Sequence, residues 1–489
     1  MINPKHKLFR WGPIDAKVIY TDVWMHGLDS TLKNFGIGWP DVLTHLSKGK
    51  VLVICDHKNL YDAGEKIFNS QILDTKIFKQ NYNLFVKQTK QILAFERIVN
   101  NTKKMNSFNE KELLKLFNSW SKAYYLFWTY GYIAELGNWG GEQILTRRLK
   151  ELKLEDHEIL EKLSAPSKLS FFQNEEADFF KVRLIRDTTQ QNKALIKHQK
   201  KYYWLKNSYN GAIVLDMVYF REELDNVSLM QAKDKLNAIK KYTLGVEKAR
   251  EGIIKKYKMD NEIANIAEKL AFSIWWQDFR KKYIYIANHV IAQILKQASI
   301  IKPVQFEDLE FYTLSEISNL LIGNKEVEIK DIIDRRKAFT LYYHANGRLE
   351  YLNSQQSAKV MAPFLNNNVK ADVKEFKGIV VSVGKINQKE KSNLEKFTGT
   401  VKILFTPKDI HKLQKGEILV APMTSPDYIF AMRKSSAIIT DEGGLTSHAA
   451  IVSRELGIPC IVGTGIATKV LKDNDKIMID IKKGVIKKI

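Results

Sequence analysis

The chain has 489 residues and a mass of 56.6 kDa, with 45% hydrophobic and 27% charged residues. This composition is that of a globular protein of about three domains, and it excludes collagen-like, coiled-coil and disordered chains. The formal net charge is +22, so the surface attracts anions such as phosphate compounds, nucleic acid or anionic lipid. Because the lysines and arginines form no long uninterrupted block, we interpret the excess as a solvated basic surface.

Hydropathy and cysteine content indicate the compartment. No run of 18 apolar residues occurs, and the first residues contain no apolar signal core. Cys55 and Cys460 are the two cysteines, too few for a disulfide framework and without the spacing of a metal site. We therefore expect a cytoplasmic protein with no membrane segment and no resident metal site built by the chain.

Residues 1–75 combine strand and loop signals. The run Val51–Cys55 is short, apolar and β-branched, which is typical of a buried strand. Gly36, Gly38 and Pro40 mark loops. We expect a small mixed N-terminal subdomain.

Residues 76–360 are expected to be mainly helical. No proline occurs between Pro40 and Pro166 or between Pro166 and Pro303, which permits long helices. Apolar residues recur at spacings of three and four over 113–120 and 263–294. A segment rich in tryptophan and tyrosine, 120–139, either lines a substrate pocket or belongs to the core. The glycines at 137–141 predict a loop at the end of that helix.

The pattern changes beyond residue 376. Short β-branched runs bounded by glycine or proline predict strands at 378–384, 399–405, 416–421, 437–440, 460–462, 477–480 and 484–486. Residues 1–369 contain 15 glycines and the much shorter remainder contains 10, so glycine is more frequent in the remainder. We predict a compact α/β domain over 376–489, joined by a hinge at 361–375. The fold class is therefore α+β multidomain, with a mostly α-helical N-terminal and central region followed by this domain.

The segment 439–459 carries the strongest chemical signal. Gly443 and Gly444 follow a predicted strand, and Thr446 and Ser447 are good helix N-cap residues. A short helix then ends at Gly457, ahead of Pro459. His448 thus falls at a helix N-terminus, where unpaired N–H groups and the helix dipole favour a neutral imidazole and an attached phosphoryl group. The alternative is a purely structural role, in which the histidine only caps the helix.

This segment closely resembles the swivelling phosphohistidine domain of the phosphoenolpyruvate-utilising enzymes. That superfamily includes phosphoenolpyruvate synthase, pyruvate phosphate dikinase, enzyme I of the sugar phosphotransferase system and rifampicin phosphotransferase. The similarity extends to 416–421, to Thr424 with Pro426 and Asp427, to 456–463 and to the predicted closing hairpin. Weaker similarity to the helical linker of synthase-like and rifampicin-phosphotransferase-like proteins covers 278–282, 311–317, 334–336 and 342–343.

The resemblance implies that His448 accepts and donates a phosphoryl group. It implies a supporting loop of Gly443, Gly444, Thr446 and Ser447, with Arg454 as a further group that could reach the phosphate. Thr446 matches a regulatory position in some members, but its capping role is the simpler interpretation. In the helical region, Arg280, Lys281, Arg335 and Arg336 are candidate anion-binding residues, although each is also a candidate surface or ion-paired residue.

Members of the superfamily take phosphate from ATP through an ATP-grasp domain or from phosphoenolpyruvate through a TIM barrel. Neither domain is apparent in this sequence, and the chain ends after the predicted C-terminal domain. We therefore expect a phosphotransferase component of dikinase type. A separate ATP-grasp partner would phosphorylate His448 from ATP, or phosphoenolpyruvate would be the donor. The helical region would bind a small-molecule acceptor, and Mg²⁺ would assist at the donor or acceptor site.

Two alternatives remain open. The chain could be a non-enzymatic phosphohistidine carrier or regulatory scaffold, which a filled helical region without a pocket would favour. It could instead bind nucleic acid, which a single basic stripe and a steep salt dependence would favour.

Overall fold

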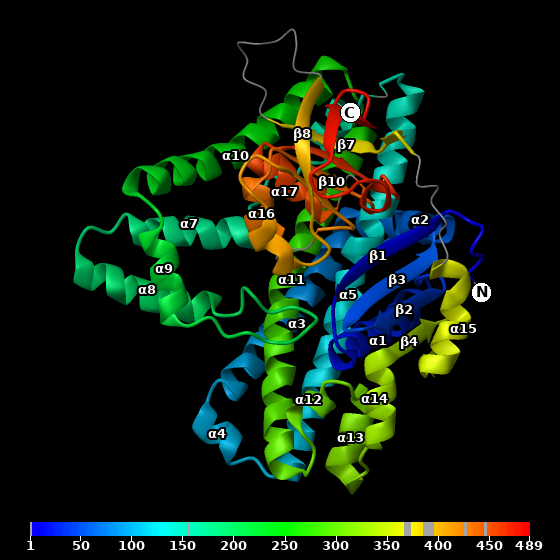
Figure 1. Cartoon of the computed structure of the whole chain (residues 1–489), viewed down its shortest axis with the longest axis vertical. Helices are drawn as coiled ribbons and strands as arrows, with labels where there is room; N and C mark the ends of the chain where they lie inside the picture. Colours follow the sequence, from blue (N-terminus) through cyan, green and yellow to red (C-terminus); the bar gives the residue numbers. More distant parts are fainter. Residues whose placement is uncertain (1, 155, 366–372, 385–395, 425–427, 445–446) are drawn as a thin grey trace.

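The computed structural model describes residues 2–154, 156–365, 373–384, 396–424, 428–444 and 447–489. The helices of the N-terminal and central part are α1 (Val18–Phe35), α2 (His57–Ile67), η1 (Phe68–Ile72), α3 (Thr75–Val99), α4 (Thr102–Asn106), α5 (Glu110–Glu151), α6 (His157–Ser164), α7 (Phe171–Arg183), α8 (Thr188–Tyr202), α9 (Met217–Asp225), α10 (Leu229–Lys256), α11 (Asn261–Ile301), α12 (Phe306–Leu309), α13 (Leu314–Gly323), α14 (Ile329–Lys337) and α15 (Ser354–Leu365). The expected helical character of this part is confirmed, and α5 and α11 form its central pair (Figure 1).

A five-stranded antiparallel sheet lies at one side of these helices. Its strands are β1 (Leu8–Asp15), β2 (Val42–Ser47), β3 (Lys50–Asp56), β4 (Ala338–Tyr343) and β5 (Leu349–Leu352), in the order β1-β3-β2-β4-β5. The strand expected at 51–55 is β3. Tyr342 and Tyr343, expected in a helical linker, instead pair in β4 with Leu43 and Val42 of β2. Residues from the two ends of the helical region thus complete one sheet, a long-range pairing that local periodicity does not reveal.

Gly137–Gly141, expected as a loop, lies inside α5. The reason is close helix packing. A Cβ atom on Gly140 would lie 2.1 Å from the carbonyl carbon of Gly64 on α2, and one on Gly137 would lie 2.0 Å from Ile72. These glycines therefore allow α2 and η1 to approach α5, and tertiary contact offsets their low helix propensity.

The C-terminal domain, residues 373–489, is built on an eight-stranded sheet of order β6-β13-β12-β8-β9-β10-β11-β7. The strands are β6 (Glu375–Lys377), β7 (Ile379–Val383), β8 (Lys396–Ile403), β9 (Ile418–Ala421), β10 (Ala437–Thr440), β11 (Pro459–Val462), β12 (Lys476–Asp480) and β13 (Val485–Lys488). Every strand expected in this domain is present. The helices are η2 (Pro407–Lys412), α16 (Ile429–Lys434), α17 (His448–Leu456) and α18 (Ala467–Val470).

The centre of this sheet is parallel, because β8, β9, β10 and β11 pair in parallel, whereas its outer strands pair antiparallel. Parallel strands align their carboxyl ends, so the loops after β9 and β10 meet at one edge of the sheet. The first of these loops contains Thr424 and the second leads to His448. The strand order therefore brings the two residues together.

The C-terminal domain packs against both earlier parts of the chain. In Figure 1 it lies above the N-terminal sheet and beside α7 and α10, with α16 and α17 near the upper part of α11. The expected hinge at 361–375 falls on the end of α15, on residues outside the described ranges and on the start of β6. A swinging motion at this connection stays a prediction.

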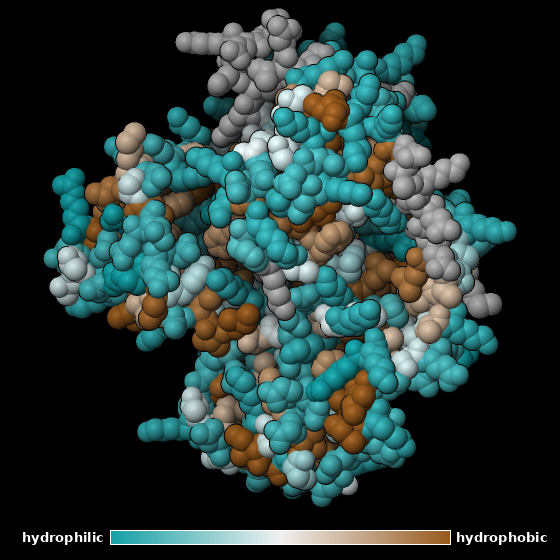
Figure 2. All heavy atoms as spheres, in the orientation of Figure 1, coloured by the Kyte–Doolittle hydropathy of each residue, from teal (hydrophilic) through white to brown (hydrophobic). Residues whose placement is uncertain are grey.

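The surface is mainly hydrophilic on the face shown in Figure 2, where hydrophobic side chains emerge in separate patches. Among the described residues, no helix combines the length and apolar character that a membrane crossing requires.

Candidate functional site

His448 is the first residue of α17. Ser447 caps this helix, and its hydroxyl accepts a hydrogen bond from the backbone N–H of Ala450 at 3.3 Å. Gly457 ends the helix in the left-handed conformation, with φ 66°. The local structure expected from the sequence is therefore present, and it fixes His448 where the first turn of a helix exposes its N–H groups.

The two ring nitrogens of His448 differ in their surroundings. Nδ1 lies 2.9 Å from the hydroxyl oxygen of Thr424, a residue that is only 3% exposed. Nε2 is buried and has no hydrogen-bond partner among the described residues. Burial lowers the pKa of His448 well below its ordinary value, and the charge of Lys281 lowers this pKa further. The imidazole is therefore neutral at physiological pH.

The glycines before α17 shape the approach to this histidine. Gly443 has φ +123°, and a Cβ atom there would lie 3.0 Å from the Ser447 hydroxyl. Gly444 has open space where a Cβ would be. Thr446, the fourth member of the expected loop, lies outside the described residues.

A cavity of about 2080 Å³ opens between the C-terminal domain and the rest of the chain, and His448 lies in its wall. The N-terminal sheet and α5 contribute aromatic side chains, among them Trp11, Trp128, Tyr132 and Trp139. The tryptophan-rich segment thus divides into two groups. Trp128 and Trp139 line the cavity, whereas Trp120 and Tyr124 are fully buried core residues.

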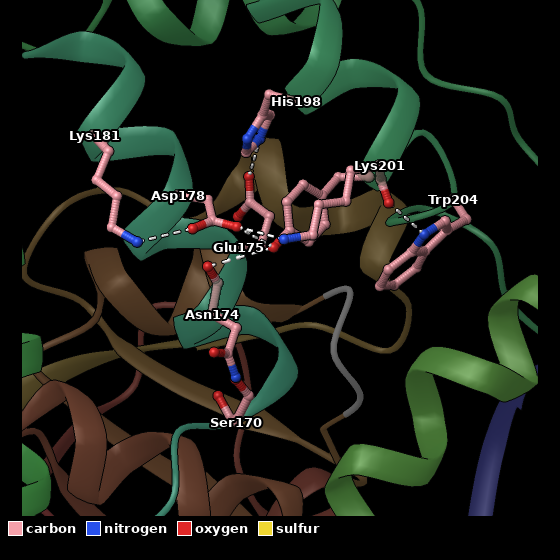
Figure 3. A network of polar contacts seen from close by, with 9 residues as sticks. Ser170, Asn174, Glu175, Asp178, Lys181, His198, Lys201 and Trp204 are labelled. Atoms are coloured by element: carbon pink, nitrogen blue, oxygen red, sulfur yellow. Dashed lines mark hydrogen bonds and ion pairs between the residues drawn. The ribbon is translucent and has the colours of Figure 1, made fainter. Parts of the chain in front are cut away.

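The helix α7 forms another wall of the cavity and is held by polar contacts (Figure 3). His198 of α8 contacts the carboxylate of Glu175 at 2.9 Å. Asp178 accepts hydrogen bonds from Lys181 at 3.0 Å and Lys201 at 2.7 Å, which lower its pKa to about 2 although burial opposes this shift. The contacts of Glu175 with His198 and of Asp178 with Lys201 join α7 to α8 and so stabilise this wall of the cavity.

The helix α11 supplies Lys281, Arg280 and Asp278 to the same cavity. Lys281 is the candidate cation that the structure brings close enough to influence His448. Arg280 also lines the cavity, but its guanidinium donates to the Gly131 carbonyl at 3.0 Å and pairs with Glu135. Its charge is therefore already balanced within the protein.

The other candidate cations lie elsewhere. Arg335 forms a two-point ion pair with Glu316 at 2.6 and 2.7 Å, and Arg336 pairs with Asp308 at 2.7 Å. Neither residue lines the cavity. Both expected anion-binding residues are instead occupied in ion pairs around α12, α13 and α14.

Arg454 lies in the last turn of α17, roughly 9 Å along the helix axis from His448 at 1.5 Å per residue. Its Nε donates to the Val381 carbonyl at 2.8 Å and lies 3.6 Å from a carboxylate oxygen of Glu161 on α6. The structure does not bring it to His448, and its contacts place it at the junction with the helical region.

Sequence reasoning missed the contact of Thr424 with His448 and gave no role to Asp278 or Glu455. Burial raises the pKa of Glu455 on α17 to about 8, and the negative charge of Asp278 raises it further. Thr424 belongs to a segment that resembles the family, and this resemblance was the one indication in the sequence that the residue lies near the site. The interaction of Asp278 with Glu455 arises from the packing of the C-terminal domain against α11, which no local sequence pattern indicates.

A Mg²⁺ ion is implied by the family resemblance. Among the described residues, no group of three or more His, Cys, Asp or Glu side chains lies close enough to hold a metal ion.

Comparison with known proteins gives a family for the segment that contains His448. Residues 413–484 match the family model of the PEP-utilising enzyme, mobile domain. The C-terminal domain belongs to the PEP-utilising enzyme superfamily.

Relatives of this mobile domain include three proteins of similar identity. A probable phosphoenolpyruvate synthase of Archaeoglobus fulgidus is 55% identical over 89 residues, and one of Methanothermobacter thermautotrophicus is 57% identical over 89 residues. The phosphoenolpyruvate synthase of Pyrococcus furiosus is 53% identical over 90 residues. Each match covers 18% of this chain and 11–13% of the relative. These three matches therefore concern the mobile domain and not the full length of the relatives.

Proposed function

We propose that the chain is a phosphotransferase component in which His448 carries the phosphoryl group. One observation carries the proposal. Nε2 of His448 is buried, without a partner among the described residues, in a histidine that lines the large cavity. A buried polar atom is normally satisfied, so an unpartnered one in a cavity wall calls for a ligand or a chemical role. A histidine that only capped its helix would not need this arrangement.

The chemistry follows from the two nitrogens. When Nδ1 carries the proton and donates it to the Thr424 hydroxyl, the lone pair resides on Nε2. This lone pair attacks the phosphorus of the donor, and the bond from phosphorus to the donor's leaving group breaks with its electron pair. In the second step an acceptor oxygen attacks the same phosphorus, and the P–Nε2 bond returns its pair to the ring. The Nδ1 proton stays in place throughout, so the ring departs as neutral imidazole.

Two features support a phosphoryl group at this nitrogen. The first turn of α17 presents N–H groups and the positive end of the helix dipole. Lys281 adds a positive charge from the opposite side of the domain junction. Both stabilise the negative charge on the transferred group.

The cavity supports an enzyme in preference to a scaffold. Its volume of about 2080 Å³ exceeds the 300–1,000 Å³ of common small-molecule sites, and tryptophan and tyrosine side chains line part of it. A regulatory carrier would not require such a space beside its histidine. We infer that a small-molecule acceptor binds here.

The donor is ATP, through a separate ATP-grasp protein, or phosphoenolpyruvate. The relatives of the mobile domain are named phosphoenolpyruvate synthases, and this chain matches only 11–13% of their length. In this proposal a partner protein supplies the donor site.

The test is to label the purified chain with [β-³²P]ATP, [γ-³²P]ATP or [³²P]phosphoenolpyruvate, with and without native-cell lysate, beside His448→Ala. Acid-labile, base-stable label on the wild type alone would support the carrier role and identify the donor. Labelling that depends on lysate would support a separate donor protein. Label that persists in His448→Ala, or none from any donor in lysate, would contradict the proposal.

A further inference from the structure

Aromatic side chains from four parts of the chain line one region of the cavity. They come from β1, α1, α5 and the segment between α8 and α9, and they are Trp11, Trp24, Trp128, Tyr132, Trp139 and Tyr209. The ring of Trp24 lies edge to face with that of Trp11, 5.5 Å between centroids, and with that of Tyr209, 4.8 Å between centroids. We call these six side chains the aromatic wall.

The aromatic wall and His448 line the same cavity. Trp11 precedes Gly12, whose backbone N–H lies 2.7 Å from the Met423 sulfur of the C-terminal domain. Met423 is followed by Thr424, which contacts His448 at 2.9 Å. One end of the wall therefore adjoins the loop that contacts the histidine, and a molecule on the wall shares its cavity with the proposed phosphoryl carrier.

The polar groups beside these rings already have partners. The guanidinium carbon of Arg280 lies 4.8 Å from the centroid of the Trp128 ring, and the charge of Arg280 is balanced by Glu135. The Tyr132 hydroxyl donates to the backbone carbonyl of Trp24 at 3.1 Å. An anionic ligand therefore finds no unpaired charge at Arg280, and the wall presents mainly the rings themselves.

Two polar atoms on the next turn of α5 are unpaired, and both are oxygens. Glu142 and Gln143 follow Trp139 by three and four positions, and they line the cavity. Glu142 Oε2 and Gln143 Oε1 are buried and have no hydrogen-bond partner among the described residues. Such oxygens favour a ligand that donates a hydrogen bond, and they disfavour a carboxylate or a phosphate group at this position.

The composition of the wall distinguishes between classes of ligand. Aromatic side chains attract another ring through edge-to-face and offset-stacked contacts, in addition to the apolar area that they bury. A sugar would place several hydroxyl groups against the wall, where Arg280 and Tyr132 already have partners. The wall therefore favours a flat, neutral ring over a polyhydroxylated or an anionic molecule.

We propose that the phosphoryl acceptor is a neutral aromatic compound bearing a hydroxyl group, a phenol or an aryl alcohol, whose ring binds on the aromatic wall. This inference rests on the proposed function of His448. In the transfer, the acceptor oxygen bonds to phosphorus and the P–Nε2 bond breaks with its electron pair returning to the imidazole. The hydroxyl proton passes to water.

Binding is tested on the full-length chain by isothermal titration calorimetry with four probes. They are 2-naphthol, its saturated analogue decahydro-2-naphthol, pyruvate and glucose. We expect 2-naphthol to bind with a Kd at least about 5-fold lower than that of decahydro-2-naphthol, the size of one aromatic pair. Pyruvate and glucose should not displace it. Equal affinity for the two naphthols, or tighter binding of pyruvate or glucose, would overturn the inference.

Variants of two partly exposed rings locate the binding site. Trp11→Leu and Tyr209→Leu should each raise the Kd of 2-naphthol about 5–10-fold. Trp11→Phe keeps a ring and should stay within about 2-fold of wild type. Trp275→Leu is the matched control, because Trp275 is a partly exposed tryptophan of α11 that stacks on Phe279 outside the cavity. Its affinity should equal that of the wild type.

Denaturant unfolding shows whether each variant is folded. If Trp11→Leu does not fold, Trp11→Phe and Tyr209→Leu decide the question. A folded Tyr209→Leu or Trp11→Leu protein that binds 2-naphthol like the wild type would contradict the assignment of the wall. So would a loss of affinity in Trp275→Leu equal to that in Trp11→Leu.

Transfer is tested separately from binding. The chain is charged with potassium phosphoramidate, which phosphorylates histidine chemically, and ³¹P NMR then follows the formation of naphthyl phosphate. We expect this product from the wild type, at least about 5-fold less from Trp11→Leu at subsaturating 2-naphthol, and none from His448→Ala. Discharge of phosphohistidine to water alone in the presence of bound 2-naphthol would overturn the acceptor assignment.

The two proposals fail in different ways. His448→Ala should still bind 2-naphthol, because the ring does not rest on the histidine. Failure of the wild type to accept phosphate from phosphoramidate, with 2-naphthol binding intact, would contradict the carrier role of His448. Normal charging of His448 without binding of 2-naphthol would contradict the aromatic acceptor alone.

Discussion

The Thr424 hydroxyl contacts Nδ1 of His448, whereas Nε2 has no hydrogen-bond partner among the described residues. At 2.9 Å from Nδ1 it can accept the proton of that nitrogen, which leaves the lone pair on Nε2. The two residues come from loops after neighbouring parallel strands, β9 and β10, so their contact depends on the sheet. The contact of this histidine thus comes from a residue 24 positions earlier in the chain.

Replacing Thr424 with valine tests this selection. Valine keeps the shape of threonine but cannot accept the Nδ1 proton, so the Nδ1–H tautomer loses about 1–2 kcal/mol. We expect the initial rate of His448 charging by phosphoramidate to fall about 10-fold. Thr424→Ser retains the hydroxyl and should stay within a few-fold of wild type. Equal rates for the valine and serine variants would show that the contact is not used.

The lowered pKa of His448 predicts an unusual pH dependence. Because burial holds this pKa below the ordinary 6.5, the ring stays neutral at pH values where a free imidazole is protonated. Charging of the wild type, divided by that of N-acetylhistidine under the same conditions, should therefore increase about 10-fold from pH 8 to pH 5.5. A ratio that stays constant would indicate an ordinary, solvated histidine.

At the scale of elements, the crossing of α2 with α5 explains the glycines of 137–141. Gly64 and Gly140 bring the two backbones into contact, and aromatic side chains of α5 then face the cavity from a fixed position. The two cysteines also serve packing. Cys55 and Cys460 are free and buried in their strands. Residues that suggest a loop or a reactive group can thus serve close packing.

Substitution of a glycine at the crossing of α2 and α5 should lower the stability of the protein. In Gly140→Ala the new Cβ would lie 2.1–2.2 Å from backbone atoms of Gly64, so the helices must separate, and we expect the free energy of unfolding to fall by about 3 kcal/mol. Gly252→Ala in α10 is the control, because its Cβ meets no atom within 4 Å and should raise stability by about 0.5–1 kcal/mol. Denaturant unfolding of both variants measures the difference. Similar stabilities would contradict the close approach.

At the scale of the whole molecule, the C-terminal domain is held against its neighbours by polar contacts. Arg433 of α16 pairs with Glu176 of α7, and the Gly12 N–H contacts the Met423 sulfur at 2.7 Å. Burial raises the pKa of Glu442 to about 7, although the nearby charge of Arg10 on β1 opposes this shift. The junction therefore contains buried carboxyls, Glu442 and Glu455, whose pKa values are raised.

These carboxyls predict that the packed arrangement weakens as pH rises. Glu455, with a pKa of about 8, and Glu442, with a pKa of about 7, bind more protons in the packed state than exposed glutamates with pKa near 4.3. Stability of the packed state is therefore fully present below the exposed pKa and is lost as pH rises through 7 to 8. Small-angle X-ray scattering should show a larger radius of gyration at pH 9 than at pH 6.

A Glu455→Gln variant provides the comparison for this prediction. Glutamine cannot ionise, so this variant should open less than the wild type over the same pH range. A radius of gyration that is independent of pH in the wild type would contradict the role of these carboxyls. So would an identical response in the variant.

The sequence by itself determined the strands of the C-terminal domain, the helical character of the centre, and the start and end of the helix at His448. These features depend on local patterns, namely β-branched runs, apolar spacing, caps and glycines, which neighbouring residues carry. The structure alone decided that β4 completes the N-terminal sheet, that 137–141 is helical, and that Arg335, Arg336 and Arg454 pair with residues away from His448. It also brought Thr424 and Lys281 to the histidine, and Asp278 to Lys281 and Glu455. These contacts join residues distant in sequence, and only packing selects them, because a lysine or an aspartate has the same local pattern at a cavity wall as in a surface ion pair.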